Sequence, residues 1–540
     1  MVRTLVTRMN PEIIALLQKS NNRLRTIPSH ELLARAGRFA RFSRGVEGLL
    51  LDHSRLHIDE ESLGLLIRLA RDSGVEAARG QLFDAAPVNW TERRPAFHMV
   101  LRDPSLLARL PADEAAAVTS SQKRMLAIAD ALHAGRLPGA PEAPVRHIVH
   151  VGIGGSLLGP RLIAEALDTG NPTAPQLYFL GSVDAHERES LLSRLDPSET
   201  AVVLVSKSFS TVDALMHGRA LQAWLQRALG AGPARQRMFA VTSEPERAGT
   251  LGIVPEQTLQ LPRWVGGRYS VWSAVSLSAA ARIGSEAFRE FQQGAACMDR
   301  HFQEADLADN LPVLSAVASV WHRNICGFGA WGVFPYDLRL RLLPAYLQQL
   351  IMESNGKSIG RDGQRLSYGT APVVFGDCGT DAQHSVFQAL HQGVEPVPIS
   401  LVGIIRPAHG DEEAQYELLA NLLAQATALA EGRTAEQARA QFGPQADPEL
   451  LAHRTFNGDR PSEIVLLDEL TPANLGQLMA MYEHRVFVES VIWGINAFDQ
   501  WGVELGKSLA PGIREALHPQ GPSLPGLDDL LAYIRERIKA

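Results

Sequence analysis

After residue 147 the chain alternates between short apolar runs and stretches whose apolar positions have helical spacing. The apolar runs predict strands near residues 147–151, 176–180, 201–205 and 237–241. Runs that are apolar throughout are typical of strands covered on both faces, and the intervening helices make consecutive strands parallel. The alternation therefore predicts an α/β domain over residues 116–284, in which helices flank a parallel sheet.

The same architecture is predicted a second time, over residues 285–505. Strand candidates lie near residues 370–375, 397–404 and 463–467, and helix candidates near 384–392 and 412–430. Thr471 and Pro472 form an N-cap and first-position pair that should begin a long helix. Residues 1–115 are predicted to be a helical segment that packs on the second domain, and residues 506–540 a helical tail.

Composition excludes several classes of partner. The 540 residues include 52 basic and 59 acidic side chains, so the net charge of −7, without a long run of one sign, indicates neither nucleic acid nor an acidic membrane surface. Three widely spaced cysteines, Cys297, Cys326 and Cys378, argue against a disulfide framework or a zinc site. No secretory signal or membrane span is evident. We expect a soluble cytoplasmic protein with a small-molecule partner, and neither a cofactor nor a metal.

The stretch HIVHVGIGGSLLGP, residues 147–160, predicts a strand, a glycine loop and a helix N-terminus. Glycine lets a ligand approach the backbone, and the free N–H groups of a helix start, with Ser156 as a cap, favour an anion such as phosphate. Leu157 stands where a dinucleotide fingerprint needs glycine, and Pro160 where a P-loop needs lysine, so nucleotide binding is not indicated. A glycine-rich turn without a ligand is the alternative.

A second loop follows the apolar strand AVVLV and brings four hydroxyls and one amine to a helix start: Ser206, Lys207, Ser208, Phe209, Ser210 and Thr211. Because the carboxyl ends of neighbouring parallel strands face one crevice, this loop and the glycine loop at 152–156 are predicted to converge on one anion. Hydroxyls that only cap the helix are the alternative.

Three further stretches carry candidate catalytic groups. VGGRYSVWS places Arg268 against glycine backbone, and PAYLQQLIMESNGKSIG places Glu353 after an apolar run, where desolvation raises the pKa of a carboxyl group and suits it to proton transfer. GTDAQHSVFQALHQG places His384 in the first turn of a helix, whose dipole favours neutral imidazole, and His391 near its C-terminal carbonyls. The alternatives are a structural arginine paired with a carboxylate, and a pair between Glu353 and Lys357.

The decapeptide FDQWGVELGK, residues 498–507, adds Gln500, Glu504 and Lys507 at the end of the long helix. Together with GIGGS, VGGRYS and MESNGK, it resembles the phosphoglucose isomerase family, whose signature it matches at each defined position. NWTERRPAFHMVLRD at 89–103 and HRTFNGDRP at 453–461 extend the resemblance over nearly the whole chain. The resemblance implies two sugar-isomerase (SIS) type α/β domains, in agreement with the predicted alternation.

The resemblance also implies a role for each candidate. Glu353 resembles the base that moves a proton between C2 and C1 of the sugar, and Arg268 the cation beside the enediolate. His384 and Lys507 resemble the pair that opens the sugar ring. The resemblance further implies that these residues bind and position the sugar phosphate: Gly155, Ser156, Ser206, Lys207, Ser208, Thr211, Gln349 and Gln500.

The implied activity is the reversible isomerisation of D-glucose 6-phosphate to D-fructose 6-phosphate through a cis-enediol(ate), in glycolysis and gluconeogenesis. The family further implies a homodimer whose active site is shared between subunits, with His384 donated by the partner. Asp381 and Ala382 depart from the Asn-Gly usual in relatives, and Leu350 replaces a usual glycine. A sugar-phosphate sensor without turnover and an isomerase of broader specificity, which Leu350 leaves open, are the alternatives.

Overall fold

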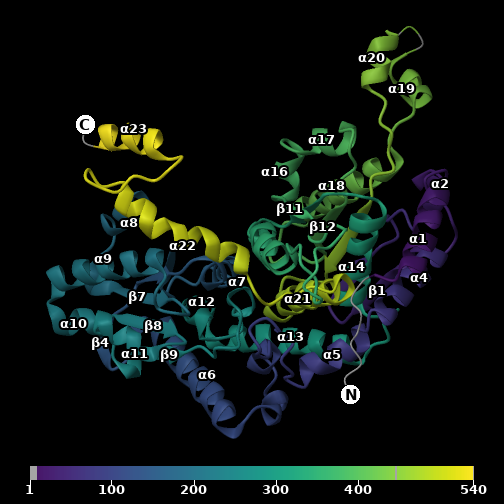
Figure 1. Cartoon of the computed structure of the whole chain (residues 1–540). Coiled ribbons are helices and arrows are strands. Elements are labelled where there is room, and N and C mark those ends of the chain that lie inside the picture. The colour runs from purple at the N-terminus through teal and green to yellow at the C-terminus, as the bar shows by residue number, and fades with distance from the viewer. Residues whose placement is uncertain (1–8, 444, 446, 539–540) are drawn as a thin grey trace. The chain divides into compact units, whose positions relative to one another are not determined.

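The structure, a computed structural model, describes residues 9–443, 445 and 447–538. The chain divides into two compact units, Met1–Ala497 and Phe498–Ala540. The first unit contains both parallel-stranded sheets, and the second contains α22 (Trp501–Ala516) and α23 (Asp528–Ile538) (Figure 1). The sheets flanked by helices confirm the predicted α/β class, whereas the predicted domain boundaries stay predictions.

The first sheet has five parallel strands in the order β6-β5-β7-β8-β9. These are β5 (His147–Val151), β6 (Gln176–Leu180), β7 (Thr200–Val205), β8 (Met238–Thr242) and β9 (Thr258–Gln260). The first four agree with the predicted strands to within one residue, and β9 was not predicted. Because β6 and β7 lie on opposite sides of β5, the loops after β5 and β7 border the crevice where the strand order reverses, which is the usual ligand site of such sheets.

Helices cover both faces of the first sheet. Val149 of β5 and Val202 of β7 pack with Leu221 in one core cluster. His150 points to the opposite face, where its Nδ1 lies 2.5 Å from Ser278 Oγ. The covering helices are α6 (Ala112–His133), α7 (Leu158–Ala166), α8 (Ala185–Leu192), α9 (Val212–Leu229), α10 (Ala231–Gln236), α11 (Pro245–Ala248) and α12 (Leu277–Ile283).

The second sheet has the order β1-β2-β13-β12-β10-β11. Its parallel strands are β10 (Ala330–Tyr336), β11 (Val373–Phe375), β12 (Ile399–Ile404) and β13 (Ser462–Leu467). The antiparallel hairpin of β1 (Ser43–Val46) and β2 (Leu49–Asp52) extends the sheet beyond β13. The sequence did not predict β10 or this hairpin, so the N-terminal segment is not wholly helical.

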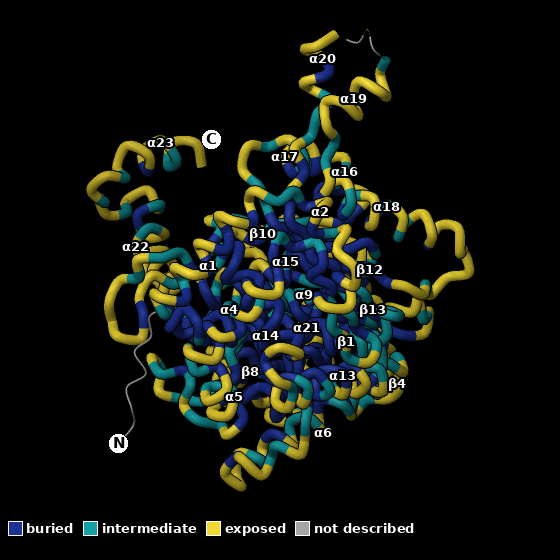
Figure 2. Tube along the Cα trace, turned by 90° about the vertical axis from the view of Figure 1, so that its right-hand side faces the viewer, coloured by how far each residue is buried: buried dark blue, intermediate teal, exposed yellow. Residues whose placement is uncertain are grey.

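The long helix α21 (Pro472–Trp493) begins as predicted, because Thr471 accepts a hydrogen bond from the Asn474 N–H and Pro472 takes the first position. Most of α21 is buried (Figure 2). It packs closely on α13 (Ser285–Glu304), since a Cβ added to Gly294 would lie 1.9 Å from the Ala473 oxygen. The backbones of these two helices are therefore in direct contact.

The first unit has further helices. They are α1 (Pro11–Leu24), α2 (Ser29–Leu33), α3 (Arg38–Phe42), α4 (Glu60–Asp72), α5 (Val75–Phe83), α14 (Leu311–Val320), α15 (Leu343–Leu347), α16 (Gly379–Gln383), α17 (Phe387–Gln392), α18 (Glu412–Glu431), α19 (Ala435–Phe442) and α20 (Pro448–His453). A small hairpin pairs β3 (Arg136–Leu137) with β4 (Ala140–Pro144). The predicted helix near 412–430 is α18, whereas the helix predicted near 384–392 is shorter and follows a separate α16.

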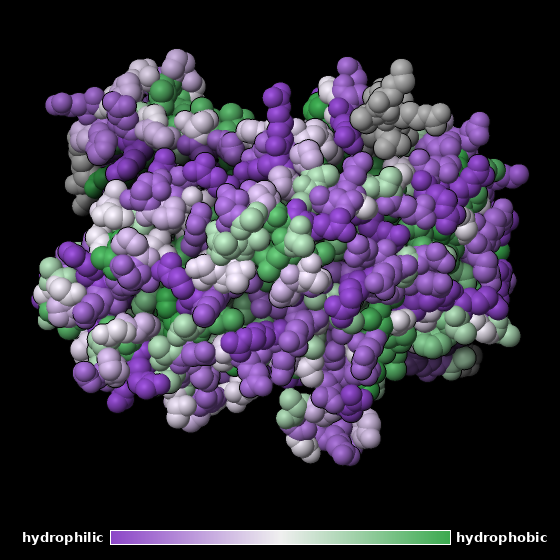
Figure 3. Space-filling model, turned by 90° about the horizontal axis from the view of Figure 1, so that it is seen from below, coloured by the Kyte–Doolittle hydropathy of each residue, from purple (hydrophilic) through white to green (hydrophobic). Residues whose placement is uncertain are grey.

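The surface mixes polar and apolar residues. Hydrophilic residues cover most of the face drawn in Figure 3, with smaller hydrophobic areas between them. Within the part of the chain that the structure describes, no helix has the length and apolar character needed to cross a membrane.

Candidate active site

The glycine loop joins β5 to α7 through a 3₁₀ turn, Gly154–Ser156. Ser156 was predicted to cap the helix, but Leu157 occupies the N-cap position of α7 and makes no side-chain cap bond. The extra turn moves Ser156 ahead of the helix, where its carbonyl oxygen lies 2.7 Å from His150 Nε2. The Ser156 hydroxyl is therefore not used as a helix cap.

This loop lies directly against two other motif segments. A Cβ added to Gly155 would lie 2.2 Å from the Gly267 carbonyl group and 2.5 Å from the Arg268 nitrogen. A Cβ added to Gly154 would lie 2.9 Å from Gln349 Nε2. Glycine is required at 155 because backbone atoms occupy the space of a side chain, and it is favoured at 154 because the backbone has a φ of 57° there. The segments GIGGS, VGGRYS and the one containing Gln349 therefore meet at the carboxyl end of β5.

The hydroxyl loop after β7 approaches the same region. Lys207 Nζ donates a 2.7 Å hydrogen bond to the carbonyl oxygen of Val265, just before the VGGRYS glycines. Ser206 Oγ donates to Thr211 Oγ1 at 3.2 Å, and Thr211 makes no side-chain cap bond to α9. Ser208 Oγ lies 2.7 Å from Ser210 Oγ. Both loops thus contact the VGGRYS segment, and the Thr211 hydroxyl has no capping role.

Lys207 is an unusual lysine. Burial, reinforced by the nearby cations Arg94 and Arg268 and opposed by Glu92, lowers its pKa to about 8. No carboxylate within the described residues forms an ion pair with Lys207. An incoming dianion would provide the missing counter-charge, which favours a phosphate at this position.

Arg268 lies in the 3₁₀ turn Gly267–Tyr269 and has a side chain only 2% exposed. Its Nε donates to Ser354 Oγ at 2.6 Å and its Nη2 to the carbonyl oxygen of Ala497 at 2.6 Å. Its Nη1 lies 3.4 Å from Glu353 Oε2. Arg268 is thus a buried arginine next to a carboxylate, as the structural alternative expected. That carboxylate, however, belongs to Glu353, which is itself a candidate catalytic residue.

Glu353 ends a π-helix, Gln348–Glu353, that continues α15. Such helices are rare and often occur at functional sites. The Glu353 side chain is 17% exposed, and Gln349 Nε2 donates a 2.9 Å hydrogen bond to its Oε2. The expected alternative pair with Lys357 is wrong, because Lys357 Nζ donates to the carbonyl oxygens of Glu353 and Ser354 instead of the carboxylate. Leu350 is fully buried in the core.

His384 differs from its predicted position, whereas His391 lies in the last turn of α17 as predicted. His384 is the C-cap residue of α16, so the argument from a positive helix N-terminus is wrong. The sequence between α16 and α17 does not continue the helix, and His384 is exposed. His391 Nε2 lies 2.9 Å from Gln425 Oε1 instead of serving the carbonyls of its own helix.

The decapeptide begins the second unit. Gln500 is the N-cap residue of α22, and Glu504 and Lys507 lie within this helix. The sequence had placed them at the end of the long helix, but α21 stops at Trp493, where Gly494 adopts a left-handed conformation. Gln500 and Lys507 are therefore carried by a helix separate from α21.

Sequence reasoning missed Tyr269 and Ser354. The Tyr269 hydroxyl lies 2.9 Å from Ser354 Oγ, which also accepts the hydrogen bond from Arg268. Both residues directly follow a candidate catalytic residue inside a quoted motif, and that adjacency was the available signal. Among the described residues, no group of three or more His, Cys, Asp or Glu side chains is arranged to hold a metal ion.

Comparisons with known proteins show the family of this chain. The family model for phosphoglucose isomerase matches residues 52–523. The glucose-6-phosphate isomerase of Caulobacter vibrioides is 44% identical over 506 residues, which cover 92% of this chain and 94% of that relative. The relative of the same name from Jannaschia sp. is 42% identical over 506 residues, with 92% of each chain covered.

A solved structure is similar over nearly the full length. The crystal structure of a glucose-6-phosphate isomerase from Chlamydia trachomatis has a TM-score of 0.83 and 30% sequence identity, and the match covers 98% of this chain and 99% of that one. The family model spans the first sheet, the parallel strands of the second sheet and the motif segments. The chain belongs to the phosphoglucose isomerase family.

Proposed function

We propose that this chain catalyses the reversible isomerisation of D-glucose 6-phosphate and D-fructose 6-phosphate. The observation that carries the proposal is the pairing of a partly buried carboxylate, Glu353, with a buried guanidinium, Arg268, at 3.4 Å. This pair lies beside the Gly154–Gly155 loop at the reversal point of the first sheet. Family membership supports the same activity.

Glu353 is the proposed general base. It removes the proton from C2 of the open-chain sugar and returns it to C1, so that a single carboxylate serves both steps. The hydrogen bond from Gln349 orients the carboxylate. Its 3.4 Å separation from Arg268 exceeds the 2.7–2.9 Å typical of a charge-assisted hydrogen bond, so the base is not locked in a close ion pair.

Arg268 is the proposed stabiliser of the enediolate oxygen. A fixed cation in a buried site stabilises charge that develops in the transition state, and removing such a group typically costs about 3–4 kcal/mol. Two of the three Arg268 nitrogens are held by Ser354 and Ala497, so the guanidinium needs little reorganisation during the reaction.

The two loops are the proposed phosphate site. Lys207 supplies the charge, and hydroxyl and backbone groups supply directed hydrogen bonds from Gly155, Ser156, Ser206, Ser208 and Thr211. Phosphate binding remote from C1 and C2 holds the carbon chain in reacting geometry. Gln349 and Gln500 are the proposed positioning residues of the sugar.

Ring opening is assigned to His384 and Lys507, which would move a proton between the ring oxygen and O1. We infer that the working form is a cytoplasmic homodimer in which His384 enters the active site of the partner. The exposure of His384, without a side-chain hydrogen bond among the described residues, supports this inference.

Mixing of variants tests the shared site. Glu353→Gln and His384→Ala homodimers are each expected to be almost inactive. After subunit exchange, half the dimers are mixed and each has one intact site, so about a quarter of the wild-type activity should return. Recovery of no activity, with exchange demonstrated by mass spectrometry, would mean that each chain completes its own site.

A coupled assay with fructose 6-phosphate tests the reaction, and transfer or washout of deuterium placed on the reacting carbon tests the proton-transfer step. The expected result is turnover with partial exchange of the label into solvent. Binding of the sugar phosphate without product would favour the sensor alternative. Turnover with the label wholly retained and untransferred would remove Glu353 from its role.

A further inference from the structure

A closed ring of hydrogen bonds lies behind the guanidinium of Arg268. Arg268 Nε donates to Ser354 Oγ at 2.6 Å, and Ser354 Oγ lies 2.9 Å from the Tyr269 hydroxyl. The Tyr269 hydroxyl donates to the Ala497 carbonyl oxygen at 3.5 Å, and Arg268 Nη2 donates to that same oxygen at 2.6 Å. Four residues from three distant parts of the chain thus form one cycle.

The hydrogen bonds of this cycle have a fixed direction. The Ala497 carbonyl only accepts, so the Tyr269 hydroxyl is the donor to it. Ser354 Oγ accepts from the guanidinium, which leaves its own hydrogen for the Tyr269 oxygen. Burial raises the pKa of Tyr269 to about 12, so the phenol keeps its proton. Ser354 is fully buried, and water does not compete for its hydroxyl.

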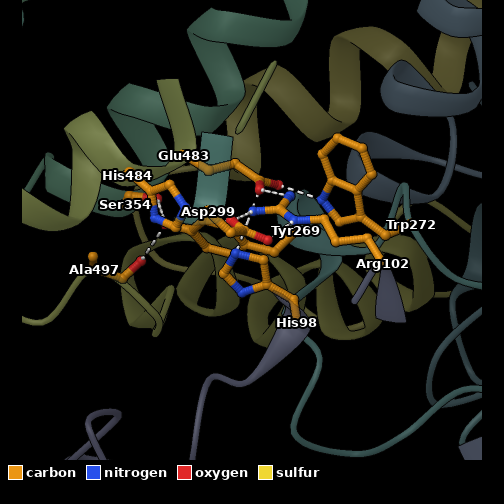
Figure 4. A network of polar contacts seen from close by, with 9 residues as sticks. All are labelled: His98, Arg102, Tyr269, Trp272, Asp299, Ser354, Glu483, His484 and Ala497. Atoms are coloured by element: carbon orange, nitrogen blue, oxygen red, sulfur yellow. Dashed lines mark hydrogen bonds and ion pairs between the residues drawn. The ribbon is translucent and has the colours of Figure 1, made fainter. Parts of the chain in front are cut away.

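Figure 4 shows Tyr269, Ser354 and Ala497 of this ring together with a buried polar network next to Tyr269. The imidazole of His98 stacks on the Tyr269 ring at 4.8 Å between centroids. Behind it, Arg102 bridges Asp299 and Glu483, with its Nε 2.7 Å from an Asp299 oxygen and its Nη1 2.5 Å from a Glu483 oxygen. These charged groups are fully enclosed, so Tyr269 packs against a part of the core that resists rearrangement.

We propose that Tyr269 and Ser354 are positioning residues that orient the Arg268 guanidinium for the isomerisation proposed above, on which this inference rests. The ring holds Nε and Nη2, and Nη1 stays 3.4 Å from the base. If the guanidinium turned to close a 2.7–2.9 Å pair with Glu353, cation and base would neutralise each other before the substrate arrives. The ring keeps the two groups adjacent but separate.

The test removes one hydroxyl at a time. Ser354→Ala deletes an acceptor of a charged donor, and we expect kcat to fall about 10- to 100-fold. Tyr269→Phe deletes the phenol hydroxyl but leaves the bonds of Arg268 to Ser354 and Ala497 in place, and we expect a fall of about 3- to 10-fold. KM for fructose 6-phosphate should stay within about 3-fold, because the phosphate loops are untouched. The double variant should lose little more than Ser354→Ala, since both act through one ring.

Matched controls come from the same core. Tyr346 Oη and Ser462 Oγ are buried and have no hydrogen-bond partner among the described residues. Each of Tyr346→Phe and Ser462→Ala therefore removes a buried hydroxyl and leaves the hydrogen-bond cycle around Arg268 intact. Both variants should retain wild-type kcat. An enediolate mimic, such as a sugar-acid phosphate, should bind the ring variants at least about 5-fold more weakly and the controls as tightly as wild type, because only a transition-state contact has changed.

Two results separate the two proposals. Suppose that wild-type protein turns over fructose 6-phosphate, and that folded Ser354→Ala and Tyr269→Phe have the wild-type kcat and the wild-type affinity for the mimic. The positioning role is then overturned, while the isomerisation stands. If wild-type protein has no turnover, the proposed function itself fails. Thermal unfolding establishes that each variant is folded. If Ser354→Ala does not fold, Tyr269→Phe serves as the test, because it keeps the buried aromatic side chain.

Discussion

The contact between the two glycine motifs can be tested by a single methyl group. Alanine at position 155 would bring Cβ to 2.2 Å from the Gly267 carbonyl group and 2.5 Å from the Arg268 nitrogen. Ordinary contacts begin at 3.4 Å, so the two backbones must separate by about 1 Å. The φ of Gly155 lies outside the left-handed region, so the conformation itself accepts alanine and the steric contact alone is responsible.

The expected effect has two parts. Overpacking in a close-packed core typically costs about 1–3 kcal/mol of unfolding free energy. A shift of about 1 Å in a group that must face the reacting atoms can cost roughly 100-fold in rate. Gly155→Ala should therefore lower both the midpoint of thermal unfolding and kcat, because Arg268 moves together with the backbone that the methyl group displaces.

Steady-state kinetics with fructose 6-phosphate and thermal unfolding, measured on the same preparation, are the assays. The control for stability is Gly267→Ala, because a Cβ at Gly267 would meet no heavy atom within 4 Å and should leave the unfolding midpoint unchanged. The alanine variant at 155 keeps its N–H, so a lost backbone donor does not explain the loss of rate. Wild-type kcat and stability in Gly155→Ala would refute the packed contact between the motifs.

Three further predictions follow from the same site and its support. Glu353→Gln should lower kcat by about 100-fold or more with KM nearly unchanged, in single-substrate kinetics, because proton transfer is lost and binding is not. KM should rise as the pH passes upward through about 8, where Lys207 loses its charge, and this rise should be absent in Lys207→Met, whose KM is high at every pH. Arg102→Met leaves Asp299 and Glu483 buried without their cation, and urea unfolding should show a loss of about 3–5 kcal/mol.

Local signals in the sequence determined much of the fold. The apolar runs that became β5, β7 and β8 are continuous over one strand length, and burial on both faces requires that composition. The run that became β6 was predicted as well, although this edge strand is only partly buried. The start of α21 was predicted because Thr471 and Pro472 act on their immediate neighbours. The motifs likewise named Glu353 and Arg268 as candidates, which the structure places 3.4 Å apart, since each motif is a short contiguous stretch.

Other elements lacked such a local signal. β10 contains Gly332 and Pro335, which weaken a strand prediction, yet it lies between β11 and β12 in the second sheet. The β1–β2 hairpin is short and becomes a strand pair by joining β13. Pairing with partners distant in sequence overcame the local preference in both cases.

The sequence by itself determined which segments are proposed to carry the chemistry, because the motifs name residues that are close along the chain. The tertiary structure alone decided how these residues meet. It placed the Gly155 backbone on that of Gly267, paired Arg268 with Glu353 instead of Lys357 with Glu353, and closed the ring through Tyr269, Ser354 and Ala497. These are steric and hydrogen-bond relations that act over a few ångströms between residues far apart in sequence, so no local pattern encodes them.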